Sequence, residues 1–232
     1  MRDRRSLQRK DKKPRMLLTG FQSYGGRAVN PAEEIVKALD GEEIAGHRIA
    51  GRVLPVDYAA LRPGIEALIA ETTPSAVICL GLWPGEPMIR LERIAVNIAD
   101  FEIADNAGVI ERGAILEDGP AAFASSLPIH EIQARLTEAG IPARLSGSAG
   151  NFLCNALMYH ALKACAGRDP APACGFIHVP YLPQQVAGLI GDTREEARFE
   201  LHQRSDLASM ALDTMVEAIR LAIAATLEAR AA

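Results

Sequence analysis

The stretch SAVICLGL, residues 75–82, is a nearly continuous apolar run. A strand without a polar face is typical of the middle of a parallel sheet that is covered by helices on both sides. Shorter strand-like runs alternate with helix-like segments along the rest of the chain, and this alternation predicts an α/β fold. The other strands are expected at residues 16–21, 47–56, 89–97, 143–146 and 175–179.

The helix-like segments carry boundary signals of their own. Asn30 is a good N-cap and Pro31 suits the first helical position, so we expect a helix from Pro31 to about residue 39. A second helix ends near residue 73, but Asp57 could cap its start whereas Pro63 would kink it or mark a later beginning. Residues 100–119 are expected to be irregular, and further helices are expected at residues 129–139, 152–166 and from about 207 to the end.

Composition bounds the class of protein. The chain has 232 residues, of which 49% are apolar and 23% charged, and this suits one globular α/β domain. The net charge of −4 argues against nucleic acid as the main partner. No apolar run approaches the ~18 residues of a membrane span, so no membrane partner is expected. With no recognisable export signal, the sequence predicts a cytoplasmic protein, and a homo-oligomer is compatible with it.

The first fifteen residues, MRDRRSLQRKDKKPR, differ from the rest because they hold eight Lys or Arg against two Asp. Such a composition favours a disordered basic tail, with a transit peptide or a nucleic-acid-binding arm as the alternatives. We therefore expect a tail over residues 1–15 and a single catalytic α/β domain over residues 16–232.

The chain has four cysteines, Cys79, Cys154, Cys165 and Cys174, with no C-x-x-C pair that would suggest a zinc site. Cys154 follows a short strand and the small-residue turn SGSAGN, and lies in the first turn of the helix expected from residue 152. A helix N-terminus favours a thiolate and offers backbone N–H groups to an oxyanion. From spacing alone, however, an inert core cysteine remains the more common case.

Two further residues are candidates for chemistry. His178 lies near the end of an apolar strand, where α/β proteins collect functional groups, and it could be a general base or a hydrogen-bonded structural histidine. Glu92 is a carboxylate in a largely apolar strand. It could pair with Arg90 or Arg93, or it could orient Nδ1–H of His178 as the third member of a triad does.

Four ordered motifs, between about residues 16 and 185, resemble the pyroglutamyl peptidase I family of cysteine peptidases, also called pyrrolidone-carboxylate peptidases. They are TGFQSYGG (19–26) with Asn30-Pro31; ERIAVN (92–97) with Asp100 and Asp105-Asn106; SAGNFLCN (148–155); and GFIHVPY (175–181). The resemblance implies removal of N-terminal pyroglutamyl residues by a triad of Cys154, His178 and Glu92. It also implies a single α/β/α domain with a twisted, mostly parallel sheet, and no metal or organic cofactor.

The resemblance also suggests how a peptide or small amide substrate is recognised. Aromatic residues surround the pyroglutamyl ring in the family, and Phe21, Tyr24 and Phe152 occupy those positions, with Tyr24 replacing a usual Phe. Leu82 stands where the family has a Gln that reads the lactam, and Arg90 replaces a usual Ser or Thr. The alternatives are therefore a hydrolase of another small acyl amide, or a catalytically silent binding homologue.

We predict that residues 1 to about 14 are dispensable for folding and for chemistry, because they hold few apolar side chains that could join a core. Deleting them should leave the melting temperature and the turnover nearly unchanged. Thermal unfolding and steady-state kinetics of the full-length and shortened chains measure this, and a clear loss of either property in the shortened chain would contradict it.

Overall fold

The computed structural model describes residues 13–25, 28–196 and 207–231, so most of the expected tail lies outside the described residues. Seven strands form the main sheet in the order β10-β5-β11-β4-β1-β3-β2. They are β1 (Arg15–Phe21), β2 (Glu43–Ile44), β3 (His47–Leu54), β4 (Ala76–Leu82), β5 (Ile89–Glu92), β10 (Ala143–Ser146) and β11 (Ala173–Val179). Only the β5–β11 and β2–β3 pairs are antiparallel among these strands, which confirms the mostly parallel sheet.

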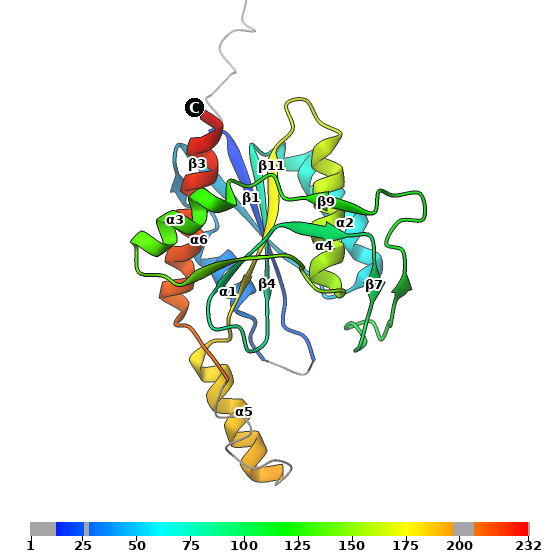
Figure 1. Ribbon diagram of the computed structural model, residues 1–232, viewed down its shortest axis with the longest axis vertical. Coiled ribbons are helices and arrows are strands. Elements are labelled where there is room, and N and C mark those ends of the chain that lie inside the picture. The colour runs from blue at the N-terminus through cyan, green and yellow to red at the C-terminus, as the bar shows by residue number, and fades with distance from the viewer. Residues whose placement is uncertain (1–12, 26–27, 197–206, 232) are drawn as a thin grey trace, which may run out of the picture.

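Helices cover both faces of this sheet in an α/β/α sandwich (Figure 1). They are α1 (Pro31–Leu39), α2 (Tyr58–Thr72), α3 (Ile129–Glu138), α4 (Leu153–Ala166), α5 (Pro183–Glu196) and α6 (Leu212–Ala231). Helices α1, α3 and α6 pack together on one side, and α2 and α4 on the other. All seven residues of β4 are buried, as a strand covered on both faces must be.

The side chains of β1 alternate between the two cores. Met16 and Leu18 join the core on the α1 and α6 side, while Leu17 and Phe21 join the core on the α2 and α4 side. This period of two is the strand geometry itself. Because β1 is buried on both faces, its sequence reads as an apolar run, and its prediction as a strand is confirmed.

The predicted caps are also confirmed. Asn30 caps α1: its side-chain oxygen accepts from the N–H of Ala32 at 3.0 Å, and its amide donates to the carbonyl of Gln22 at 3.0 Å. Asp57 caps α2 by accepting from the N–H of Ala60, and Pro63 lies inside that helix. The open question about the start of α2 is therefore settled in favour of Asp57.

The single strand expected over residues 89–97 is wrong. The strand is interrupted at Arg93. The residues after the interruption form a separate strand, β6 (Ile94–Val96), which pairs with β9 (Ala122–Ala124) in a two-stranded sheet. The cause is that the backbone of Arg93 bonds in two directions: its N–H donates to Ser146 and its carbonyl accepts from Ser125.

Three smaller expectations also need correction. Residues 100–119 are mostly irregular, but they contain half of a short pair of strands: β8 (Arg112–Gly113) pairs with β7 (Ala99–Asp100). The last helix begins at Leu212 and not near residue 207. Helix α5 was not expected, and Figure 1 shows that it extends away from the sheet. None of the described helices is long and apolar enough to cross a membrane.

Gly20 allows α1 to lie close against β1, and it yields a test of the packing. A Cβ built at Gly20 would lie 2.5 Å from the carbonyl oxygen of Ala32. We expect Gly20→Ala to lower the free energy of unfolding by about 1–3 kcal/mol, because backbone must shift. Gly64→Ala is the matched control: Gly64 lies inside α2 with no atom within 4 Å of its built Cβ.

The control should stabilise the protein by about 0.5–1 kcal/mol, because alanine is the better helix former. Urea unfolding of both variants measures the two effects. Equal stabilities for Gly20→Ala and the wild type would contradict the close packing of α1 on β1.

Candidate active site

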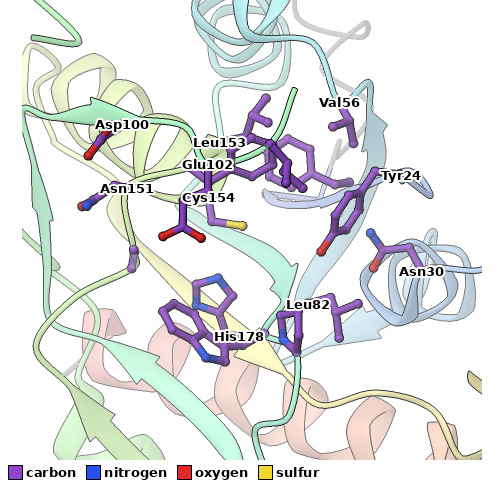
Figure 2. Close-up of a pocket in the computed structure, with 17 residues that line it drawn as sticks. Tyr24, Asn30, Val56, Leu82, Asp100, Glu102, Asn151, Leu153, Cys154 and His178 are labelled. Carbon is purple, nitrogen blue, oxygen red and sulfur yellow. The ribbon is translucent and has the colours of Figure 1, made fainter. Parts of the chain in front are cut away.

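A cavity of about 440 Å³ opens at the carboxyl ends of β1, β4 and β11, beside the N-terminus of α4 (Figure 2). Helix α4 and strand β11 bring two of the three predicted catalytic residues, Cys154 and His178, into its lining. The four predicted substrate-binding residues, Phe21, Tyr24, Leu82 and Phe152, line the same cavity. Glu92 is not part of the lining and lies behind His178, with which it is in contact.

Cys154 is the second residue of α4, a helix whose N-cap, Phe152, makes no side-chain capping bond. The start of this helix is fixed by the residue after the cysteine. Asn155 is fully buried, and its side chain accepts from the N–H of Val96 at 2.9 Å and donates to the carbonyls of Val96 and Ile98 at 2.9 and 3.0 Å. Strand β6 thus holds the turn of helix that presents Cys154.

The Cys154 thiol occupies the space that Gly81 leaves empty. A Cβ at Gly81 would lie 2.7 Å from the Cys154 sulfur and 2.8 Å from the ring of Phe176. All four cysteines have free thiols; Cys79, Cys165 and Cys174 are buried, whereas Cys154 is partly buried and reaches the cavity. In the sequence, Gly81 is only a glycine near the end of an apolar strand. That it leaves space for the Cys154 thiol depends on contacts between distant segments.

His178 and Glu92 form a buried hydrogen-bonded pair. His178 Nδ1 lies 2.8 Å from Glu92 Oε1, and the two side chains are 1% and 0% exposed. A carboxylate only accepts, so Nδ1 carries the proton and Nε2 is the nitrogen left for a proton from the cavity. The ring is also packed between Phe176 and Trp83, with centroid distances of 4.7 and 5.0 Å.

Both alternatives considered for Glu92 apply at once. Arg90 Nε donates to the same oxygen, Oε1, at 2.7 Å, so Glu92 is an ion-pair partner as well as the partner of His178. Arg93 takes no part in these two contacts of Glu92. The structure therefore brings together the three residues that the resemblance placed in a triad, and adds Arg90 to them.

Burial sets the protonation of the resting pair. Burial raises the pKa of the Cys154 thiol to about 12, and the nearby Glu92 and Cys79 add to the effect. Burial lowers the pKa of His178, and Glu92 opposes this through its hydrogen bond and its charge. The thiolate-favouring effect expected of the helix N-terminus is outweighed, so near pH 7 a neutral thiol faces a neutral imidazole, and a base must remove the thiol proton.

The opposite wall of the cavity is aromatic. Phe152 packs edge-on against Phe101 at a centroid distance of 4.5 Å, and Tyr24 lies 6.5 Å from Phe152. Phe21 and Leu82 extend this apolar lining, and both are almost fully buried. The wall suits a small flat ring without charge.

Sequence reasoning missed several lining residues. Trp83 lies over the guanidinium of Arg90. The end of β7 and the loop that follows it add Asp100, Glu102 and Ile103 to the cavity. The buried carboxylate of Asp105 holds this loop by accepting from the N–H groups of Tyr58, Ala107 and Val109. The sequence predicted an irregular segment here, with Asp105-Asn106 among the family motifs, and no sequence signal showed that this segment reaches the cavity.

Comparison with known proteins agrees with this geometry. A family model described as pyroglutamyl peptidase matches residues 14–229. The pyrrolidone-carboxylate peptidase of Pyrococcus furiosus is 40% identical over 215 residues, covering 92% of this chain and 98% of that protein. The pyrrolidone-carboxylate peptidase of Cupriavidus pinatubonensis is 40% identical over 216 residues, covering 91% and 92%.

Solved structures give the same result. The X-ray structures of the pyrrolidone carboxyl peptidase of Pyrococcus furiosus and its Cys-free mutant include a chain that matches with a TM-score of 0.85 at 40% identity, covering 93% of this chain and 99% of that one. The match by sequence and the match by structure each extend over most of the chain, so this protein is a member of the pyroglutamyl peptidase family of cysteine-type hydrolases.

Proposed function

We propose that the protein removes N-terminal pyroglutamyl residues from peptides, with Cys154 as nucleophile, His178 as general base and acid, and Glu92 as the residue that orients His178. The observation that carries this proposal is that Cys154 and the Glu92-supported His178 line one apolar cavity, in a chain of this family. A thiol and an imidazole are sufficient for this reaction, so it calls for no metal or organic cofactor.

In the first half of the reaction, His178 Nε2 takes the thiol proton while the sulfur attacks the carbonyl carbon of the pyroglutamyl residue. Negative charge develops on the carbonyl oxygen, and the uncapped N–H groups at the start of α4 lie where they can stabilise it. The imidazolium then gives its proton to the leaving amine as the C–N bond breaks. This leaves a thioester on Cys154 and frees the shortened peptide.

In the second half, water attacks the thioester carbonyl while His178 takes a proton from the water. The C–S bond breaks, the proton returns to the sulfur, and pyroglutamate leaves. Glu92 accepts the hydrogen bond from Nδ1–H and holds the imidazole in one tautomer and one orientation.

The apolar lining supports binding of the lactam ring, but Leu82 offers it no hydrogen bond. Phe21 and Phe152 can cover the ring faces, and Leu82 adds apolar contact. The lactam N–H and C=O would then depend on other groups of the lining, which are backbone groups and polar side chains such as Asn30, Asp100 and Asn151. This feature favours one alternative within the same chemistry, a relaxed hydrolase that also accepts other small acyl amides, because specificity against a ring without the oxygen depends on such bonds.

We place the reaction in the cytoplasm. All four cysteines have free thiols, and one of them is the proposed nucleophile. A reducing compartment keeps such thiols from oxidation.

The proposal predicts hydrolysis of a pyroglutamyl chromogenic amide by the wild type and a loss of at least ~10³-fold in kcat for Cys154→Ala. Cys165→Ala, the same change further along α4 at a buried site, is the matched control and should retain activity. Parallel kinetics on a prolyl amide, which lacks the lactam oxygen, distinguish a specific pyroglutamyl peptidase from a relaxed hydrolase. Similar rates on both amides would point to the relaxed hydrolase, and no activity of the wild type on either would support a silent homologue.

The pKa of His178 predicts the pH dependence. Because burial lowers the pKa of His178, its base form persists below the ordinary value of 6.5, and the acid limb of kcat/KM should lie below pH 6.5. Glu92 raises the pKa of His178, so Glu92→Gln should move this limb to still lower pH. The same change should lower kcat by about 10²–10⁴-fold, because the neutral amide no longer enforces the correct tautomer. A Glu92→Gln enzyme with wild-type kcat and an unmoved limb would leave Glu92 a purely structural residue.

A further inference from the structure

Arg90 makes contacts that the proposed reaction does not use. Its side chain is almost buried, with Nε 2.7 Å from Glu92 Oε1 and Nη2 2.7 Å from the carbonyl oxygen of Ser148. Its Nη1 lies 3.4 Å from Glu86 Oε2, and the guanidinium carbon is 3.6 Å from the ring centroid of Trp83. One planar cation therefore touches the partner of His178, the turn before α4, and a cavity-lining indole.

We propose that Arg90 is a positioning residue that holds the Glu92 carboxylate against His178 and fixes the turn carrying Cys154 relative to that pair. The effect of this positioning on catalysis rests on the proposed peptidase function. The contacts themselves concern only this chain.

The first step of the argument is the unequal use of the two oxygens of Glu92. Oε1 accepts from both His178 and Arg90, whereas Oε2 is buried with no hydrogen-bond partner among the described residues. Rotation of the carboxylate out of this orientation would withdraw Oε1 from Nδ1, and the imidazole would lose its fixed partner. The donor from Arg90 opposes that rotation because it comes from a second direction and a rigid fork.

The second step is the link to the nucleophile. Ser148 lies in the turn between β10 and α4, and its carbonyl accepts from Arg90 as well as from the Ser146 hydroxyl, at 3.1 Å. Cys154 follows six residues later in α4. A shift of the Arg90 side chain would therefore displace both the Glu92 carboxylate and this turn. These two features support His178 and Cys154, respectively.

The third step is that Arg90 is itself held in place. Glu86 is 4% exposed and bonds Arg144 as well as Arg90, with Arg144 Nε at 3.0 Å and Nη2 at 2.6 Å. Trp83 covers the guanidinium and places its ring against His178. The two cations and two carboxylates of this network balance in charge, and this offsets the cost of burying Glu86, Arg90 and Glu92.

Electrostatics gives the proposal a signature. The charged and titratable groups facing His178 are Glu92 and Arg90 from β5, Glu86 from the loop before β5, and Cys154 from α4. Arg90 lowers the pKa of His178, whereas Glu92 and Glu86 raise it. Removing the cation at position 90 should therefore move the pKa of His178 upward, opposite to the effect of Glu92→Gln.

The experiment compares Arg90→Met with Arg144→Met. Both changes remove one cation from Glu86 and leave a shorter, unbranched and uncharged side chain, but only Arg90 touches Glu92 and Ser148. The pKa of His178 is measured by NMR titration of the imidazole in a Cys154→Ala background, with His178→Gln to assign the signal. Steady-state kinetics on the pyroglutamyl amide are measured with Cys154 intact.

We expect Arg90→Met to raise the pKa of His178 and to lower kcat roughly 10- to 100-fold with little change in KM. Arg144→Met should change the pKa of His178 and kcat by far less. Arg90→Lys keeps the charge but not the planar fork, so kcat should fall while the pKa of His178 stays near that of the wild type. The Arg90→Lys variant also tests the positioning role of Arg90 if Arg90→Met does not fold.

Wild-type kcat in Arg90→Met or Arg90→Lys would overturn the proposal, and so would equal losses in Arg90→Met and Arg144→Met. If the wild type does not act on pyroglutamyl amides while the NMR shift appears only in Arg90→Met, the assigned substrate fails and the positioning role of Arg90 stands.

Discussion

The site depends on burying one negative charge. The Glu92 side chain has no exposed surface, and an ion removed from water costs several kcal/mol unless partners compensate it. Its partners in the described structure are His178 on β11 and Arg90 on its own strand, β5. These residues meet because β5 pairs antiparallel with β11, with His178 opposite Arg90. A slip of one residue in this register would turn the Glu92 side chain to the other face of the sheet, so the pairing of the strands and the pairing of the charges require each other.

The rest of the fold brings the nucleophile to that buried pair. Strand β4 lies beside β11 with Gly81 opposite His178, and the missing side chain of Gly81 leaves the space that the Cys154 sulfur occupies. Asn155 ties the first turn of α4 to the second sheet, so the thiol approaches from a helix whose start cannot move freely. The reacting groups thus come from β5, β11 and α4, which are far apart in the chain, and the mostly parallel sheet makes them neighbours.

Local chemistry explains which features could be predicted from the sequence. Strand β4 is apolar throughout because both its faces are covered, and Asn30 and Asp57 mark helix starts because their side chains bond nearby N–H groups. Features that depend on distant partners could not be predicted. Nothing local breaks the strand at Arg93, whose backbone bonds Ser146 and Ser125. The candidate residues Cys154, His178 and Glu92 followed from motifs, and Arg90 was one of two possible partners of Glu92, but the choice of Arg90 over Arg93 and the high pKa of the thiol arise only from packing.

The pKa of the thiol bears on how such a site can work. Burial disfavours both a thiolate at Cys154 and an imidazolium at His178, so charge separation in the empty cavity is unfavourable. In the proposed reaction, however, the negative charge does not remain on sulfur, because attack carries it to the carbonyl oxygen beside the start of α4. The positive charge formed on His178 lies against Glu92, already in place and already ionised. The fixed dipole and the fixed carboxylate therefore match the charges of the transition state better than those of the resting state, which is the condition for lowering a barrier and not merely for binding substrate.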